Sequence, residues 1–107
     1  MTEDKNNLVI IHLDRPRFLK FGHKALKQLG TLTGKSFEKM SENDFDLADL
    51  EKIIWCGLQA DAKENGEVLK IDQMEDLLDQ AESFGHIVDA MNKAFSTAFQ
   101  RTEKEKN

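Results

Sequence analysis

The sequence predicts a mainly α-helical domain, a small bundle of four to five helices with an amino-terminal β-hairpin. Three observations favour this fold class. The chain has 107 residues, which suits one compact domain. It contains one Pro and six Gly, so helices meet few breaks. Apolar residues recur at helical spacing after residue 23, whereas the first aliphatic run is too short for a stable helix. We expect a single domain over 1–107, with an ordered core at about 8–99 and flexible tails at 1–7 and 100–107.

Two short strands are expected at the amino terminus. Residues 8–13 are mostly aliphatic and β-branched, as is typical of a strand, and residues 18–21 form a second candidate after a turn over 14–17. A lone hairpin is only marginally stable in water, so this one should pack on helices. Within it, Ile10 and Phe18 are candidates for self-association, which would give a homo-oligomer.

The helices are predicted from their capping residues and apolar stripes. Gly34 should end a first helix that starts near His23, and Ser36 could cap a short turn that carries Phe37 and Met40. Three further helices should begin at Asp46, Asp72 and Ser83, and residues 61–70 are polar enough to form a loop. The apolar face of the helix after Asp46 is expected in the core, with these members: Leu50, Ile54, Trp55 and Leu58.

Composition narrows the functional classes. The net charge is −5, which disfavours nonspecific binding to nucleic acid or to an anionic membrane. The single Cys excludes an internal disulfide and a zinc site built from cysteines. No apolar run approaches the ~20 residues that span a bilayer, and the acidic, polar start is unlike a signal peptide. We therefore expect a cytoplasmic protein that contacts neither nucleic acid nor membrane.

No catalytic set emerges from the spacing of reactive residues. His12, His23 and His86 fall in three different elements and share no metal-binding spacing. The run Gly34-Lys35-Ser36 lacks the first glycine of a phosphate-binding loop, because that position is Leu29. The sequence therefore predicts no enzyme, no cofactor and no metal.

A calcium-binding helix-loop-helix module is the weaker of two alternatives. Residues 61–72 resemble an EF-hand loop, with Asp61 first and Gly66 sixth. Lys63, however, places an ammonium group at the third ligand position, and Asp72 is shorter than the usual bidentate Glu. The repulsion and the missing oxygen oppose calcium binding.

The second alternative is a small regulatory or antitoxin-like module that binds a toxin or nucleic acid. Its support is one basic cluster between the hairpin and the first helix, which comprises Arg15, Arg17, Lys20, Lys24 and Lys27. The rest of the surface should be acidic, which limits this possibility.

The last helix carries many large apolar side chains for a small domain, which either all fill the core or fill it in part and leave a groove for a partner. Surplus aromatic and Met surface is a common way to hold an amphipathic helix of another protein. The predicted partner-binding residues are Phe84, Val88, Met91, Phe95 and Phe99.

Two short segments suggest a family. Thr33-Gly34-Lys35-Ser36 ends the first helix, and Trp55-Cys56-Gly57-Leu58 lies within a later one, after a hairpin and before an acidic helix and a Phe-Ala-rich helix. Over roughly 8–99 this order resembles the tail assembly chaperones of long-tailed bacteriophages and prophages. The resemblance implies a non-enzymatic protein of the host cytoplasm, absent from the finished virion. It also implies that the protein solubilises the tape measure protein and helps recruit tail tube subunits.

Overall fold

The computed structural model describes residues 8–36, 39 and 46–106, and it describes side chains as far as Ala98. An antiparallel hairpin precedes the helices, which confirms the predicted mainly α fold with an amino-terminal hairpin. The elements in chain order are β1 (Val9–His12), β2 (Pro16–Leu19), α2 (His23–Thr33), α4 (Leu47–Glu64), the 3-10 helix η1 (Ile71–Gln73), α5 (Met74–Leu78) and α6 (Phe84–Lys106).

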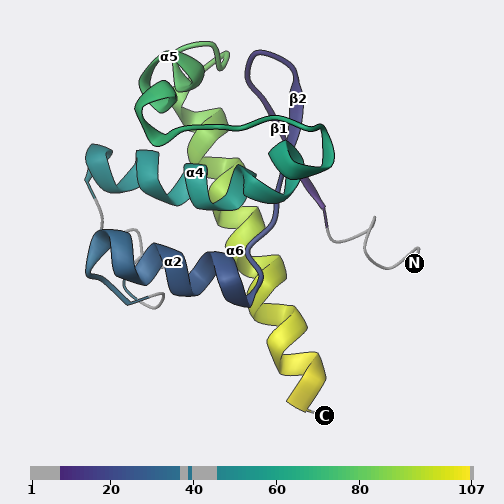
Figure 1. The fold of residues 1–107 in the computed structure, drawn as a ribbon. Coiled ribbons are helices and arrows are strands. Elements are labelled where there is room, and N and C mark those ends of the chain that lie inside the picture. Colours follow the sequence, from purple (N-terminus) through teal and green to yellow (C-terminus); the bar gives the residue numbers. More distant parts are fainter. Residues whose placement is uncertain (1–7, 37–38, 40–45, 107) are drawn as a thin grey trace.

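Helix α4 lies at the centre of the arrangement. It runs beside α2 on one side, and β2 packs against it on another. The long helix α6 passes behind α2 and α4 and lies against β1 (Figure 1). The hairpin is thus supported by two helices, as its marginal stability in isolation requires.

The hairpin pairs Val9 with Leu19 and His12 with Pro16. Pro16 therefore opens β2, where its missing N–H is tolerated, although we expected it in the turn. Alternate residues such as Ile11 and Leu19 point into the core. The hairpin is also tied to α6, because the His12 N–H donates to Nε2 of His86 at 3.0 Å.

The predicted helix caps are largely confirmed. Gly34 ends α2 in the left-handed region, with φ of 71°, and its N–H donates to the Gly30 carbonyl. Asp46 and Asp49 form a reciprocal capping box at the start of α4. The Ser83 hydroxyl accepts from the His86 N–H at the start of α6. Phe37 and Met40 lie outside the described residues.

Three boundaries differ from the prediction. Helix α4 continues to Glu64, so the loop expected from Asp61 starts later. Asp72 does not cap a helix; it lies within η1, and the Gln73 side chain accepts from the Lys70 N–H instead. The backbone of α6 is helical as far as Lys106, beyond the tail boundary expected after residue 99.

The core forms around α4, where Ile53, Ile54 and Leu58 are fully buried. The predicted burial of Leu50, Ile54 and Leu58 is confirmed. Trp55 is only partly buried, and its indole N–H donates to the Leu69 carbonyl at 2.8 Å. This bond holds the segment after α4 against the helix.

Gly57 permits a close approach between α4 and the end of the hairpin. A Cβ atom there would lie 2.7 Å from Cζ of Phe21 and 3.0 Å from Cδ2 of Leu19. The Lys20 N–H also donates to the Gly57 carbonyl at 2.9 Å. Phe21 packs against Phe95 of α6, with ring centroids 4.8 Å apart, so this contact joins three elements.

We predict that Gly57→Ala destabilises the protein. The added methyl group would displace Phe21 and Leu19, both buried, at a cost of about 2–3 kcal/mol. The better helix propensity of Ala returns only about 1 kcal/mol. Denaturant unfolding should therefore show a net loss of about 1–2 kcal/mol in the free energy of unfolding.

Gly30→Ala in α2 is the matched control. A Cβ there meets only the Lys35 carbonyl oxygen, at 3.8 Å. This variant should be as stable as the native chain or gain up to about 1 kcal/mol. Equal effects of the two substitutions would contradict the steric role of Gly57.

Candidate functional site

The structure separates the five predicted partner-binding residues. Phe84, in the first turn of α6, is 56% exposed, and Val88 is half-buried. Met91 is 0% exposed and Phe95 is 3% exposed, so the prediction that these two face a partner is corrected. Both side chains join the core cluster that α4 and the hairpin complete. The side chain of Phe99 lies outside the described part of the chain.

The two residues predicted for self-association lie side by side. Ile10 and Phe18 are directly opposite each other across the hairpin. Ile10 is 48% exposed and Phe18 is half-buried. They form a small apolar patch, and self-association through it stays a prediction.

Phe84 lines a groove at the amino-terminal end of α4. The groove has a volume of about 520 Å³ and lies between α4, α5 and the start of α6. We call it the acidic groove, and its lining residues are Leu47, Leu50, Glu51, Glu75, Asp76, Leu78, Asp79, Ala81, Ser83, Phe84 and Ile87.

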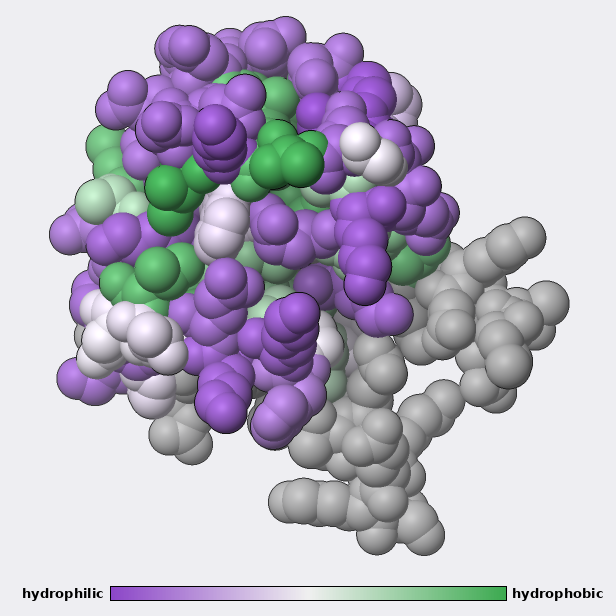
Figure 2. Space-filling view, in the orientation of Figure 1, coloured by the Kyte–Doolittle hydropathy of each residue, from purple (hydrophilic) through white to green (hydrophobic). Residues whose placement is uncertain are grey.

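Leu47 is, with Phe84, the other large apolar side chain on this groove that is exposed. It is 66% exposed, although its spacing from Leu50 and Ile54 is that of the apolar face of α4. As the first residue of α4 it lies at the end of the core, where the stripe meets solvent. Its position directly after the cap Asp46 is the sequence feature from which its exposure could have been predicted. Figure 2 shows that apolar patches over α4 and the segment crossing it interrupt a mostly hydrophilic face.

The rim of the acidic groove carries uncompensated negative charge. Glu51, Glu75, Asp76 and Asp79 belong to its lining, and within the described ranges none of them forms an ion pair. An apolar floor with this rim fits an amphipathic segment whose apolar stripe is flanked by Lys or Arg.

A second groove, of about 440 Å³, lies between α2 and the carboxy-terminal half of α4. We call it the basic groove, and it is lined by Lys20, Gly22, His23, Lys24, Ala25, Gln28, Cys56, Gln59, Ala60 and Lys63. Burial raises the pKa of the Cys56 thiol to about 11, so the thiol stays protonated at neutral pH. Cys56 is therefore a poor nucleophile, as expected for a structural cysteine.

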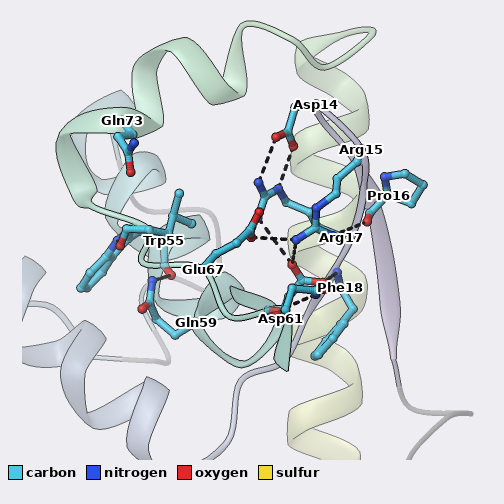
Figure 3. Close-up of polar contacts among 12 residues, drawn as sticks. Asp14, Arg15, Pro16, Arg17, Phe18, Trp55, Gln59, Asp61, Glu67 and Gln73 are labelled. Carbon is cyan, nitrogen blue, oxygen red and sulfur yellow. Dashed lines mark hydrogen bonds and ion pairs between the residues drawn. The ribbon is translucent and has the colours of Figure 1, made fainter. Parts of the chain in front are cut away.

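An ion-pair cluster fastens the hairpin to the end of α4 (Figure 3). Arg15 contacts Asp61 and Glu67, both at 2.8 Å. Arg17 contacts Asp14 at 2.8 Å, Glu67 at 3.0 Å and Asp61 at 3.5 Å. Asp61 also accepts a hydrogen bond from the Phe18 N–H. The sequence did not indicate this cluster, because Asp61 and Glu67 are far along the chain from the two arginines.

The cluster weakens both alternative functions. Asp61, the first ligand of the hypothetical calcium loop, lies in a helix and is neutralised by two guanidinium groups. No group of His, Cys, Asp and Glu suited to a metal ion occurs among the described residues. Arg15 and Arg17, the first two cations of the basic cluster, already bind carboxylates and are not free to bind phosphates.

The ion pairs lower the pKa of three carboxyl groups. A hydrogen bond from Arg17 is the main cause for Asp14, and one from Arg15 is the main cause for Glu67. Lys35 lowers the pKa of Asp49 across 2.6 Å. These carboxyl groups therefore release their protons more readily in the folded chain than in the unfolded chain.

We predict that Arg17→Met destabilises the fold by about 3 kcal/mol, because it leaves buried carboxylate charge with fewer partners. Arg15→Met, at a more exposed site, should cost clearly less than Arg17→Met. Denaturant unfolding of both variants measures the difference. If the Arg17 variant were no less stable than the Arg15 variant, the buried ion pair would not have the role assigned to it.

We also predict acid sensitivity. A lowered folded-state pKa means that the unfolded chain binds more protons near pH 4, so stability is present above that pH and is lost as pH falls below it. The loss between about pH 6 and about pH 3 should be smaller in Arg17→Met than in the native chain. An identical pH profile would contradict this. The Lys35–Asp49 pair, which Arg17→Met leaves intact, should keep part of the dependence in both proteins.

None of the helices in the described ranges is both long and apolar enough to cross a membrane. The resemblance to phage tail assembly chaperones stays a prediction. Comparison of the chain with protein-family models, curated proteins and solved structures finds no match.

Proposed function

We propose that this chain is a phage tail assembly chaperone whose acidic groove binds apolar helical segments of the tape measure protein. One observation supports this most strongly. Leu47 and Phe84 are the most exposed apolar side chains on a groove with an unpaired acidic rim. Exposed apolar surface of this kind on a small domain is typical of a site that another protein covers.

The shape of the groove suits a helix. Its walls come from α4, α5 and the first turns of α6, so an incoming helix could pack as a further member of the bundle. The client would bury its apolar stripe on Leu47, Leu78 and Phe84. A client rich in apolar helical faces aggregates unless such faces are covered, and the net charge of −5 keeps the chaperone itself dispersed.

The remaining parts of the proposal come from the family resemblance. The chaperone is non-enzymatic, acts in the cytoplasm of the host cell and leaves before the virion is complete. It also helps recruit tail tube subunits to the coated tape measure protein. The hairpin patch of Ile10 and Phe18 is the candidate surface for forming homo-oligomers on a long client.

Co-expression tests the proposal. The native chain should keep the tape measure protein of its own gene cluster in the soluble fraction and should retain it on an affinity column. Leu47→Ser with Phe84→Ser should weaken retention about tenfold or more, because both changes remove apolar contacts at the groove.

The matched control is Val68→Ser with Ile71→Ser. It also removes two exposed apolar side chains, but from surfaces outside the groove. This control should hold the tape measure protein as the native chain does. The proposal fails if the tape measure protein is equally insoluble with and without the native chain. Equal retention by the groove variant and the native chain would exclude the acidic groove as the site.

A further inference from the structure

We propose that the basic groove is a second docking site, which binds an acidic peptide segment of a partner protein. The site is distinct from the acidic groove, since the two share no lining residue. The proposal therefore stands on separate residues from those that carry the chaperone function.

Unpaired positive charge is the first support. Lys20 follows β2, Lys24 belongs to α2 and Lys63 to α4, and all three are exposed. In the part of the chain that the structure describes, none of the three forms an ion pair, in contrast to Arg15 and Arg17. A chain with 20 acidic residues has many chances to neutralise its cations. Three unpaired lysines around one hollow create a local positive potential that favours an anionic ligand.

The start of α2 adds to this potential. Gly22 is the amino-terminal cap of α2 and lines the groove, and it offers no side chain to the helix end. The first turn of α2 contains no acidic residue. The positive end of the helix dipole therefore acts in the same direction as the three lysines.

The lining favours a peptide over a nucleic acid. Small residues at Gly22, Ala25 and Ala60 leave room for a main chain. Gln59 donates its amide N–H to the Trp55 carbonyl, so its side-chain oxygen remains able to accept from a peptide N–H. A nucleic-acid strand carries charge at every nucleotide, and beyond the groove it would meet a protein of net charge −5. A short acidic peptide avoids that repulsion.

The two grooves use opposite ends of α4. Leu47, Leu50 and Glu51 line the acidic groove, whereas Cys56, Gln59, Ala60 and Lys63 line the basic groove. One chain can therefore bind a basic amphipathic helix and an acidic segment at the same time, and so bring two different proteins together.

The test uses a fluorescein-labelled peptide of alternating Glu and Ala, with the Gln-Ala peptide as the uncharged control. Fluorescence anisotropy should show that only the Glu-Ala peptide binds the native chain, and that its affinity falls as salt rises. Amide shift changes in a nuclear magnetic resonance titration should centre on Lys20, Lys24 and Gln28.

Charge reversal gives the matched comparison. Lys20→Glu with Lys63→Glu should weaken peptide binding by about tenfold or more. Lys70→Glu with Lys93→Glu gives the same net charge at sites outside the groove, and it should bind as the native chain does.

Four outcomes would overturn the proposal: no binding of the Glu-Ala peptide, shift changes centred on the acidic groove, equal loss in the two charge-reversed variants, or tighter binding of single-stranded DNA than of the peptide. The chaperone function is tested separately. Leu47→Ser with Phe84→Ser should leave peptide binding unchanged, whatever it does to the tape measure protein.

Discussion

The contact between the hairpin and α4 at Gly57 fixes the positions of the other functional elements. Only a glycine at position 57 lets Phe21 and Leu19 lie so close to the axis of α4. The hydrogen bond from the Lys20 N–H to the Gly57 carbonyl fixes where the chain after β2 lies along that helix. Lys20 and the start of α2, which follow directly, are thereby placed on the basic groove. Phe21 also packs on Phe95, which positions α6 and hence Phe84 on the acidic groove. The positions of both grooves therefore depend on the absence of a side chain at Gly57.

Ion pairing decides which charges of this chain can meet a partner. The sequence places five cations close together between the hairpin and the first helix, which is typical of a nucleic-acid contact. In the fold, Arg15 and Arg17 form ion pairs with Asp14, Asp61 and Glu67. These pairs hold the hairpin against the end of α4. Lys20 and Lys24 lie outside that cluster and line the basic groove. The same stretch of sequence therefore supplies structural cations and binding cations, and only the fold separates them.

Local signals predicted the elements well, and long-range packing limited the prediction of the site. Asp46, Ser83 and Gly34 act on backbone groups within a few residues, so their roles follow from sequence. The periodicity of α6 identified an apolar face but could not show what covers it, and Met91 and Phe95 proved to be core residues. Asp61 lies in a polar stretch typical of a loop, yet Arg17, 44 positions earlier, makes its burial in a helix possible. That partnership has no local sequence signature.

The segment Trp55-Cys56-Gly57-Leu58, which supports the family resemblance, shapes the scaffold more than the binding surface. Trp55 holds the segment after α4 through Leu69, Gly57 admits the hairpin, and Leu58 fills the core. Only Cys56 reaches a groove, and its thiol is buried and protonated. The residues of this segment position the hairpin and the helices, whereas exposed residues such as Leu47, Phe84 and Lys63 determine the polarity and charge of the grooves. Substitutions at Leu47, Phe84 or Lys63 can therefore change the charge and polarity of the grooves without disturbing the contacts at Gly57.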